Sequence, residues 1–379
     1  MLYTVEILDN SQNFLAPIQI LAPLNDKGDT IKYSKKLSDW GVCRFRMGTR
    51  DPLLTTEGDI LQPFKNHVRV KRAGVTVWQG VIVKNPSRNR NFIEVEARSY
   101  LYLLDRVLLR HDAADGKGAE NYRTYKSGTM AAAITTFISE AQSDMGTVLT
   151  PLTVGTINNP DFPSDFKDAA GTTLSGTWTF SDNFQIKFDY RSILYVLQTF
   201  GMYCNFDFEL TNAMVFNFKQ TIGNKQPDLR FTYGEFGNIE DYDTPLDGDG
   251  MANFIQGVAA DNDFNIIKAD VQDASSIALY GKISAIAAYA DVKNANLLKS
   301  RIREELNLAK TPDAEIHVTL NDRAYPQGVY DIGDTIPIKV SDHVISTNSQ
   351  RRIVALEVTV KDTGDESVRL LTNKPRDTQ

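Results

Sequence analysis

Apolar and polar residues alternate with a period of two along the first third of the chain, a pattern typical of β-strands with one buried face. Strands are predicted at His67–Lys71 and at Phe92–Ala97, on either side of Val75–Lys84. The middle strand is apolar on both faces, which is typical of a closed barrel, a sandwich or a subunit contact. Its apolar side chains are therefore candidates for a contact between modules: Val77, Trp78, Val81 and Ile82.

Other segments have a helical period, with apolar residues three and four positions apart. The longer ones are Ser127–Met145, Ser192–Phe200 and Val292–Ala309. A shorter helical pattern follows Ser99, a residue type favoured at the N-cap. After Pro312 the alternation of period two returns and continues to the end of the chain.

Two stretches far apart in the sequence share one layout, a meander of three strands with a polar turn before the third. The first meander consists of His67–Arg72, Val77–Asn85 and Phe92–Ala97. The second consists of Asp334–Val340, Arg351–Lys361 and Ser367–Thr372. Strand lengths and turns agree, although residue identities differ. The repeat predicts two related β modules at opposite ends of the chain, with α+β material inserted between them.

We therefore expect four parts. The β modules would occupy residues 1–110 and 311–379, and an inserted α+β domain would occupy 111–225. Within the insertion, 146–182 is rich in Thr, Ser, Asn, Gly and Pro and is predicted to be a long polar excursion, exposed or wrapped on a neighbour. Residues 226–310 are expected to contribute connecting strands and a helix.

Composition and charge argue against several classes of protein. The 379 residues carry a net charge of -7, whereas a surface that coats nucleic acid needs clustered Lys and Arg. The first residues lack the basic and apolar regions of a signal peptide, and no apolar run approaches the ~18 residues that span a bilayer. Only two cysteines occur, Cys43 and Cys204, so neither a disulfide framework nor a structural zinc site is expected.

The stretch YDIGDTIPIKV, Tyr330–Val340, contains two aspartates that could be a working carboxylate pair or the ends of a turn. Gly333 stands where a type II turn requires a positive φ angle, which glycine adopts at little cost. Asp331 and Asp334 suit the flanks of a turn, because short carboxylates accept bonds from nearby backbone N–H groups. We interpret this stretch as a structural turn that feeds the next strand.

The densest acidic stretch, DYDTPLDGDG, spans Asp241–Gly250. A calcium site there would use four carboxylates, those of Asp241, Asp243, Asp247 and Asp249. The EF-hand spacing fails, because the sixth position counted from Asp247 is Ala252, where that loop needs glycine. The alternative is a solvated acidic turn between two strands, and we expect no metal ion and no cofactor.

Two further features could carry chemistry on carbohydrate. Asp207 and Glu209 share one face of a predicted strand and could form a glycosidase pair, or they could be the wet side of a half-buried hairpin. Trp178 could stack on a sugar, or it could anchor its own loop or pack on a partner. The four histidines are scattered, and no HExxH, GxSxG or P-loop pattern occurs. The sequence therefore shows no catalytic constellation, and no enzyme activity is expected.

The run LYGKISAIAAYADVKNANLLKSRIREELNLAKTPDAEIHVTLNDRAYPQGVYDIGDTIPIKV, Leu279–Val340, resembles a block found in baseplate hub proteins of tailed bacteriophages. It has a Tyr-Gly opening, a helix, an alternating strand and a Tyr-Asp-x-Gly-Asp turn. The N-terminal segments WQGVIVKN and NFIEVEARSYLYLLDR are similar to the first module of the same family, which includes the hub-like part of siphophage tail-associated lysins. Together these regions cover about half of the chain.

The resemblance implies two tube-like antiparallel β-barrel or sandwich modules per chain and a homotrimeric ring with pseudo-sixfold symmetry at the tail tip of the virion. Its partners would be distal tail or tube proteins, the tape measure protein and tip or fibre proteins, and DNA would pass through the lumen without specific binding. We expect the lumen wall to be neutral or acidic overall. Because the chain ends at Gln379, just after the second module, no appended lysin domain is expected.

Two alternatives come from other classes. A carbohydrate-binding or glycan-degrading tail protein would use Trp178, Asp207 and Glu209, and it would show a pocket and turnover of cell wall. A hexameric distal tail ring protein would carry a single tube-like module per chain, against which the second meander and the helix at Val292–Ala309 argue.

The turn interpretation generates a first prediction. Gly333→Val places a β-branched residue at positive φ, at a cost on the order of 1–3 kcal/mol. We expect poor assembly of the protein without loss of any chemical activity, measured by thermal unfolding and native mass. A Gly333→Val protein as stable as the parent chain would contradict the turn.

Overall fold

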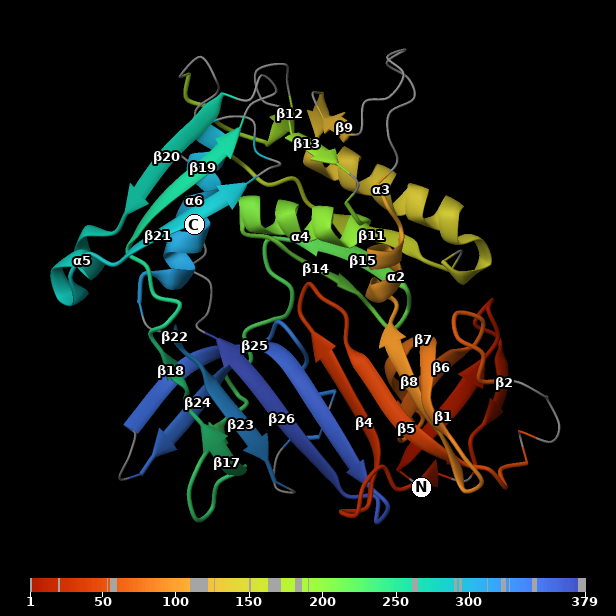
Figure 1. The fold of residues 1–379 in the computed structure, drawn as a ribbon. Helices are drawn as coiled ribbons and strands as arrows, with labels where there is room; N and C mark the ends of the chain where they lie inside the picture. Colours follow the sequence, from red (N-terminus) through yellow and green to blue (C-terminus); the bar gives the residue numbers. More distant parts are fainter. Residues whose placement is uncertain are drawn as a thin grey trace.

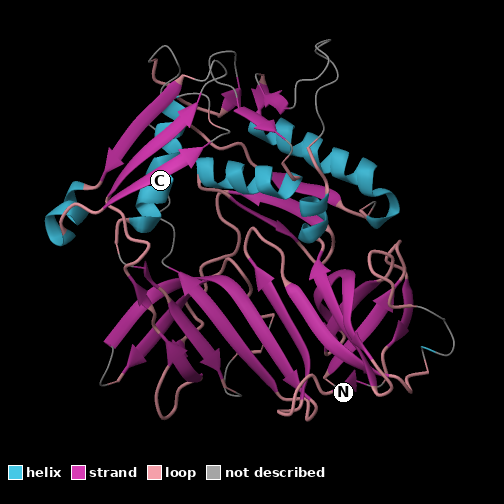
Figure 2. Ribbon diagram, in the orientation of Figure 1, coloured by secondary structure: helices cyan, strands magenta, loops and turns pink. Residues whose placement is uncertain are grey.

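The computed structural model describes residues 2–19, 21–52, 54, 60–109, 122–125, 127–149, 151–162, 172–180, 186–189, 191–260, 265–289, 292, 295–311, 313–321, 325–326, 328–342 and 346–373. Within these residues the fold has two layers (Figure 1). One layer consists almost entirely of strands, and the other combines helices with small sheets (Figure 2). This arrangement confirms the expected β-dominated α+β class.

The first β module is built from N-terminal strands whose alternate residues point to its core. β5 (Val42–Gly48) buries Cys43, Phe45 and Met47 and directs the two intervening arginines to the opposite face. This alternation follows from the pleat of a strand. The other strands of the module are β1 (Tyr3–Leu8), β2 (Phe14–Pro17), β3 (Leu21–Ala22), β4 (Asp29–Lys36), β6 (His67–Arg72), β7 (Val75–Arg88) and β8 (Phe92–Ser99).

The second β module draws on two separated parts of the chain. Its C-terminal strands are β23 (Ile316–Leu320), β24 (Thr335–Ser341), β25 (Ser346–Lys361) and β26 (Glu366–Asn373). β16 (Phe231–Thr232) pairs with β24, and β17 (Ile239–Asp243) pairs with β23. The module therefore includes strands from 226–310, which the sequence pattern assigned to connecting material. The pattern missed this because pairing between strands distant in sequence leaves no local signal.

β4 and β25 join the two modules edge to edge. Their antiparallel register places Tyr33 opposite Val358 and Lys36 opposite Ala355. One sheet consequently runs through both modules in the order β17-β23-β26-β25-β4-β5-β8-β7-β6-β1-β2. The buried apolar residues of the two modules also form one hydrophobic cluster. The β layer is therefore continuous across the chain.

The predicted meanders correspond to strands with matching pairing. In the first module β7 lies between β6 and β8, and in the second β25 lies between β24 and β26, all antiparallel. The turn between β6 and β7 contains Ala73 at φ 48° and Gly74 at φ 83°. Two positive φ angles match the right-handed twist of the flanking strands in a tight hairpin.

The four candidate contact residues on β7 are all buried within the chain. Val77, Trp78 and Ile82 belong to the core of the β layer, whereas Val81 packs with the inserted region. Within one chain, the junction between modules is made by β4 and β25 rather than by β7. A contact of β7 with a module of another chain stays a prediction.

The inserted region lies above the first module and is organised around three helices, α2 (Leu101–Arg106), α3 (Met130–Met145) and α4 (Ile193–Cys204) (Figure 1). The side chain of Thr129 accepts from the Ala132 N–H at the start of α3, and that of Ser192 accepts from the Tyr195 N–H at the start of α4. Such N-caps satisfy backbone donors that lack a partner within the helix.

The predicted N-cap Ser99 does not cap α2. Ser99 is the last residue of β8, and its hydroxyl accepts from the Gly41 N–H at 3.0 Å. The helix begins after Tyr100, which makes no side-chain cap. Serine is a favoured N-cap residue, but the Ser99 hydroxyl is bonded instead to the backbone just before β5.

The polar excursion 146–182 is described in part, and the described residues pack onto the insertion. β11 (Thr153–Ile157) adds in parallel to the hairpin of β14 (Asp207–Leu210) and β15 (Val215–Lys219). The remaining short elements of the insertion are β9 (Tyr122–Tyr125), β10 (Gly128–Thr129), η2 (Gly146–Val148), β12 (Thr179–Phe180) and β13 (Ile186–Asp189).

A small α/β unit completes the upper layer. Its sheet has the order β20-β19-β21, comprising β19 (Phe254–Ala260), β20 (Ile266–Gln272) and β21 (Ser284–Tyr289). α6 (Ala295–Ala309) packs Leu298 and Ile302 against Gly257, where a Cβ atom would come within 2.8 Å of Ile302. The unit also contains α5 (Ala274–Tyr280). The pair β18 (Leu246–Asp247) and β22 (Asp313–Ala314) lies between this unit and the second β module (Figure 1). Among the described residues, no helix is long and apolar enough to cross a membrane.

Buried His67 on β6 generates a prediction about acid stability. Its Nδ1 lies 3.0 Å from the Tyr100 hydroxyl, and burial lowers the pKa of His67 from 6.5 to about 4. Between these values the unfolded chain binds the proton more readily than the folded chain does. The stability that neutral His67 contributes is therefore complete above pH 6.5 and is lost as the pH falls towards 4, by on the order of 3 kcal/mol.

We expect His67→Gln, which keeps a polar partner for Tyr100, to lose less stability than the parent chain between pH 7 and 4.5. Urea unfolding at both pH values measures the difference. An unchanged pH dependence in His67→Gln would contradict this assignment.

Candidate functional site

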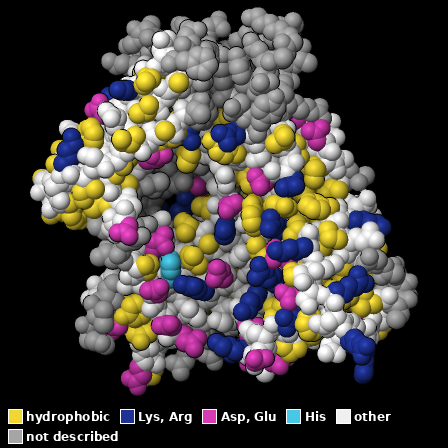
Figure 3. Space-filling model, in the orientation of Figure 1, with side chains coloured by type: hydrophobic (Ala, Val, Ile, Leu, Met, Phe, Trp, Pro, Cys, Tyr) yellow, Lys and Arg dark blue, Asp and Glu magenta, His cyan; other side chains and the backbone are white. Residues whose placement is uncertain are grey.

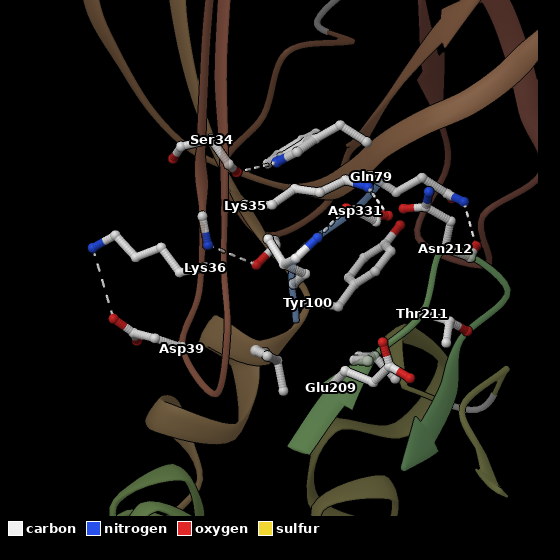
Figure 4. A pocket seen from close by; sticks show the side chains of 16 residues that line it. Ser34, Lys35, Lys36, Asp39, Gln79, Tyr100, Glu209, Thr211, Asn212 and Asp331 are labelled. Atoms are coloured by element: carbon white, nitrogen blue, oxygen red, sulfur yellow. Dashed lines mark hydrogen bonds and ion pairs between the residues drawn. The ribbon is translucent and has the colours of Figure 1, made fainter. Parts of the chain in front are cut away.

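The most connected site of the described chain lies where both β modules meet the inserted region. A cavity of about 240 Å³ opens there, lined by β4, β7, the start of α2, the β14–β15 hairpin and the turn before β24 (Figure 4). A second cavity, of about 260 Å³, shares Glu209 and the turn with the first. Polar and apolar side chains both line the two cavities.

Arg352 on β25 is the centre of this junction. Arg352 is 3% exposed, and its Nη2 donates to the Asp207 carboxylate of β14. The same guanidinium donates to the Ile222 carbonyl at 2.9 Å and to the Gly333 carbonyl at 3.1 Å. One arginine thus ties the second module to the insertion and to the segment that links them. A planar fork of five donors suits such a role.

The turn residues singled out in the sequence lie in the same junction. Gly333 has φ 88°, and the Asp334 N–H donates to the Asp331 carbonyl at 3.2 Å, as in a β-turn. The buried Asp334 carboxylate accepts from the Asn224 N–H at 2.7 Å and from the Gln226 amide at 3.3 Å. The turn therefore holds the chain that leaves the insertion, in addition to reversing its own strand.

Two glycines allow this close approach of backbones. A Cβ atom on Gly333 would lie 2.4 Å from the Ile222 carbonyl oxygen, and one on Gly223 would lie 2.2 Å from the Gly333 carbonyl carbon. Both distances are far below van der Waals contact. The turn consequently requires glycine for its positive φ and also for space.

The first module holds the insertion through backbone carbonyls. The Gln79 amide donates to the Asn212 carbonyl at 2.5 Å, and the Asn212 amide donates back to the Thr76 carbonyl at 3.0 Å. The Gln198 amide of α4 donates to the Ser38 carbonyl at 3.2 Å. These bonds fix the β14–β15 hairpin over β7 and the loop after β4.

Ion pairs also cross between the modules. Lys35 of β4 pairs with Asp331 at 2.7 Å, and Arg72 of β6 makes a bidentate contact with Glu366 of β26. Tyr3 donates to the same Glu366 carboxylate. Burial and this carboxylate raise the pKa of Tyr3, and hydrogen bonding to Glu366 raises the pKa of Arg72.

Asp207 and Glu209, the carboxylates proposed as a catalytic pair, lie in two different environments. Asp207 is 1% exposed and is paired with Arg352, so it does not lie on a wet strand face as the sequence suggested. Glu209 lines both cavities and accepts from the Asn217 amide at 2.9 Å. The alternating pattern failed at Asp207 because a buried arginine from β25 takes the place of water.

Trp178 is fully buried, which excludes the exposed sugar-stacking role. Its ring stacks on the ring of Phe162, with 5.0 Å between the ring centroids, and its backbone N–H donates to the Pro160 carbonyl. The tryptophan thus anchors its own loop.

The acidic stretch 241–250 begins within the extended strand β17. Asp241 and Asp243 lie on β17 opposite Thr319 and His317, and the side chain of Asp247 lies outside the described residues. Over the described part of the chain, no group of three His, Cys, Asp or Glu side chains could hold a metal ion.

Sequence reasoning missed Arg352, Asn224 and Gln226. The only local signal was the pair Arg351–Arg352 at a strand position followed by IVALEV, where a charged residue stands next to apolar ones. Such a residue marks a buried contact, but its partner can be identified only from the tertiary structure.

The architecture matches solved structures of known proteins along nearly its full length. A tail protein from Neisseria meningitidis MC58 aligns with a TM-score of 0.64 at 11% identity, covering 98% of this chain and 96% of the other. The chain shares the fold of this tail protein. The 43 kDa tail protein of prophage MuSo2 from Shewanella oneidensis gives 0.62 at 12% identity, covering 98% of each chain.

The prophage tail protein gp18 from Listeria monocytogenes EGD-e gives a TM-score of 0.57 at 13% identity, covering 98% of this chain and 95% of the other. No protein-family model matches the sequence, and no curated protein matches it at a significant level. The similarity to these tail proteins is therefore a similarity of fold, with little identity between the sequences.

The two ion pairs at the junction generate a matched prediction. Asp207→Asn leaves Arg352 as an uncompensated buried charge, and we expect the free energy of unfolding to fall by about 3–5 kcal/mol. Asp331→Asn removes the partner of Lys35 where the carboxylate is 53% exposed, and we expect a loss of about 0–1 kcal/mol.

Urea unfolding of the two variants measures the contrast, because both substitutions keep the side-chain shape. Equal costs for Asp207→Asn and Asp331→Asn would show that Arg352 does not hold the junction.

Proposed function

We propose that this protein is a structural hub of a phage tail tip or baseplate and that three copies form a ring with pseudo-sixfold symmetry. The observation that carries the proposal is the pair of β modules joined in one sheet through β4 and β25. Three chains with two similar modules each can continue a sixfold tube. Heterologous contacts of this kind close into a ring when the rotation between subunits is right.

The outer face of the continuous sheet supplies the wall of the lumen in this proposal. On the first module, the outward side chains of β5 and β8 pair with one another: Arg44 with Glu96 at 2.8 Å and Arg46 with Glu94 at 2.9 Å. On the second module, Asp241, Asp243 and Glu357 are exposed. Figure 3 shows Lys and Arg gathered over the centre of this face, with Asp and Glu among and below them.

Part of this basic charge is paired: Arg46 contacts Glu94, and Arg44, Lys84 and Arg98 share Glu96. Phosphates bind strongly where Lys and Arg are free to replace counterions. The pairing with these two glutamates supports passage of DNA without specific binding. Distal tail or tube proteins, the tape measure protein and tip or fibre proteins would meet the ring at its two ends and periphery, within the virion tail.

The alternatives are less well supported. The glycan-degrading reading needs an accessible Trp178 and a carboxylate pair, but Trp178 is buried and Asp207 is occupied by Arg352. A hexameric distal tail ring protein would need one module per chain, and this chain has two that share a sheet. The role that we propose is accordingly structural and non-enzymatic.

Native mass spectrometry of the purified protein tests the proposal. We expect a particle of three chains, each of 42.4 kDa. Incubation with host cell wall should release no soluble glycan or peptide. A six-chain particle, a monomer at all concentrations, or glycan release that Glu209→Gln abolishes would each overturn the hub assignment.

A further inference from the structure

The two β modules correspond strand by strand in their order of pairing. In the sheet, β6, β7, β8, β5 and β4 follow one another in the first module, and β24, β25, β26, β23 and β17 follow in the same order in the second. β7 shifts register against β8 between Ile82 and Lys84, and β25 shifts against β26 at the equivalent place, between Ile353 and Ala355. β7 has a second shift, between Lys84 and Ser87, that β25 lacks. In this correspondence β17 takes the place of β4, and β7 takes the place of β25.

The correspondence identifies two strand edges that resemble the two sides of the β4–β25 junction. The first half of β25 pairs with β24, and its second half pairs with β4. β7 likewise pairs with β6 only as far as Val81, and beyond that its described strand partner is β8. β17 pairs with β23, and its other edge has a single bridge in the described chain, between Ile239 and Tyr233.

These two edges lie at opposite ends of the β layer, with β17 at the lower left and β7 on the right (Figure 1). They also carry opposite charges. β17 exposes Glu240, Asp241 and Asp243. The end of β7 and its hairpin expose Arg88, Arg90 and Lys84, of which Lys84 pairs with Glu96 at 3.2 Å. Opposite charges across strands stabilise a pairing, and like charges directly opposite destabilise it. A contact of β17 with β17, or of β7 with β7, is therefore disfavoured.

We propose that β17 of one chain pairs antiparallel with the end of β7, residues 84–88, and with Asn89, which follows it, in a second copy of this chain. This inference rests on the proposed ring and specifies the contact that closes it. The sheet then passes from chain to chain in the same way as it passes from module to module through β4 and β25. Open edges of this kind pair readily with another strand, and their charges select a head-to-tail partner.

The correspondence also predicts the register. Asp243 takes the position of Lys32, because Lys32 and Asp243 face the equivalent residues Arg44 and His317. Asn89 takes the position of Thr359. Since Lys32 lies opposite Thr359 in the junction within the chain, Asp243 should lie opposite Asn89 of the neighbouring chain.

Disulfide cross-linking tests this register. In a Cys204→Ser background, Asp243→Cys with Asn89→Cys should give bands of two and three chains on a non-reducing denaturing gel. Lys32→Cys with Thr359→Cys is the positive control and should link within one chain. Asp270→Cys with Asn89→Cys is the negative control, because Asp270 lies on β20 of the small α/β unit, and it should give a single-chain band.

Charge reversal tests the electrostatic part. Asp241→Lys with Asp243→Lys, or Arg88→Glu with Arg90→Glu, should weaken assembly about tenfold or more. Combining all four changes in one chain should restore the trimer, because each reversed edge then meets a reversed partner. Lys268→Glu with Asp270→Lys, on β20, should leave assembly unchanged. Thermal unfolding confirms that each variant is folded.

The outcomes separate this inference from the proposed function. A native trimer that neither cross-links through Asp243 and Asn89 nor responds to the edge charges would retain the ring and overturn the β17–β7 contact. A chain that stays monomeric at all concentrations would overturn both. Cross-linked dimers and trimers together with restoration by the fourfold swap would support both.

Discussion

The edge-to-edge pairing of β4 with β25 is the constraint on which the rest of the structure depends. It converts two β modules into one sheet, so the orientation of each module is set by backbone hydrogen bonds rather than by a flexible linker. The shared hydrophobic core makes the same junction costly to open. Any ring built from this chain inherits its module spacing from that pairing.

The inserted region is held against this sheet by a few buried polar groups. Arg352 bonds to Asp207 and to two carbonyls, and Asp334 bonds to backbone and amide groups of the segment that returns from the insertion. Buried polar groups of this kind are expensive unless they are satisfied. Their mutual satisfaction therefore specifies one placement of the insertion, where apolar packing alone would permit several.

In the proposed ring, the surface of this sheet would serve both as a channel wall and as the contact between chains. In the middle of the face, Arg44 and Arg46 of β5 pair with Glu96 and Glu94 of β8, and Glu96 is shared with Lys84 and Arg98. At its two ends, the acidic β17 and the basic end of β7 carry exposed charges of opposite sign. Pairing of charges across the face reduces adhesion to phosphate, while separation of charges at the ends distinguishes one edge from the other.

The sequence by itself determined the local elements and the repeat. Period-two alternation located the meanders, the 3.6 period located α3, α4 and α6, and the glycine of the Asp331–Asp334 turn indicated a positive φ angle. Those signals are local, because pleat, helical pitch and φ preference act on neighbouring residues. Only the tertiary structure decided that β17 belongs to the second module, that β4 and β25 join, that Ser99 serves a strand and that Asp207 meets Arg352. Each of these depends on which distant segment satisfies a backbone edge or a buried charge, and a single sequence carries no local record of that choice.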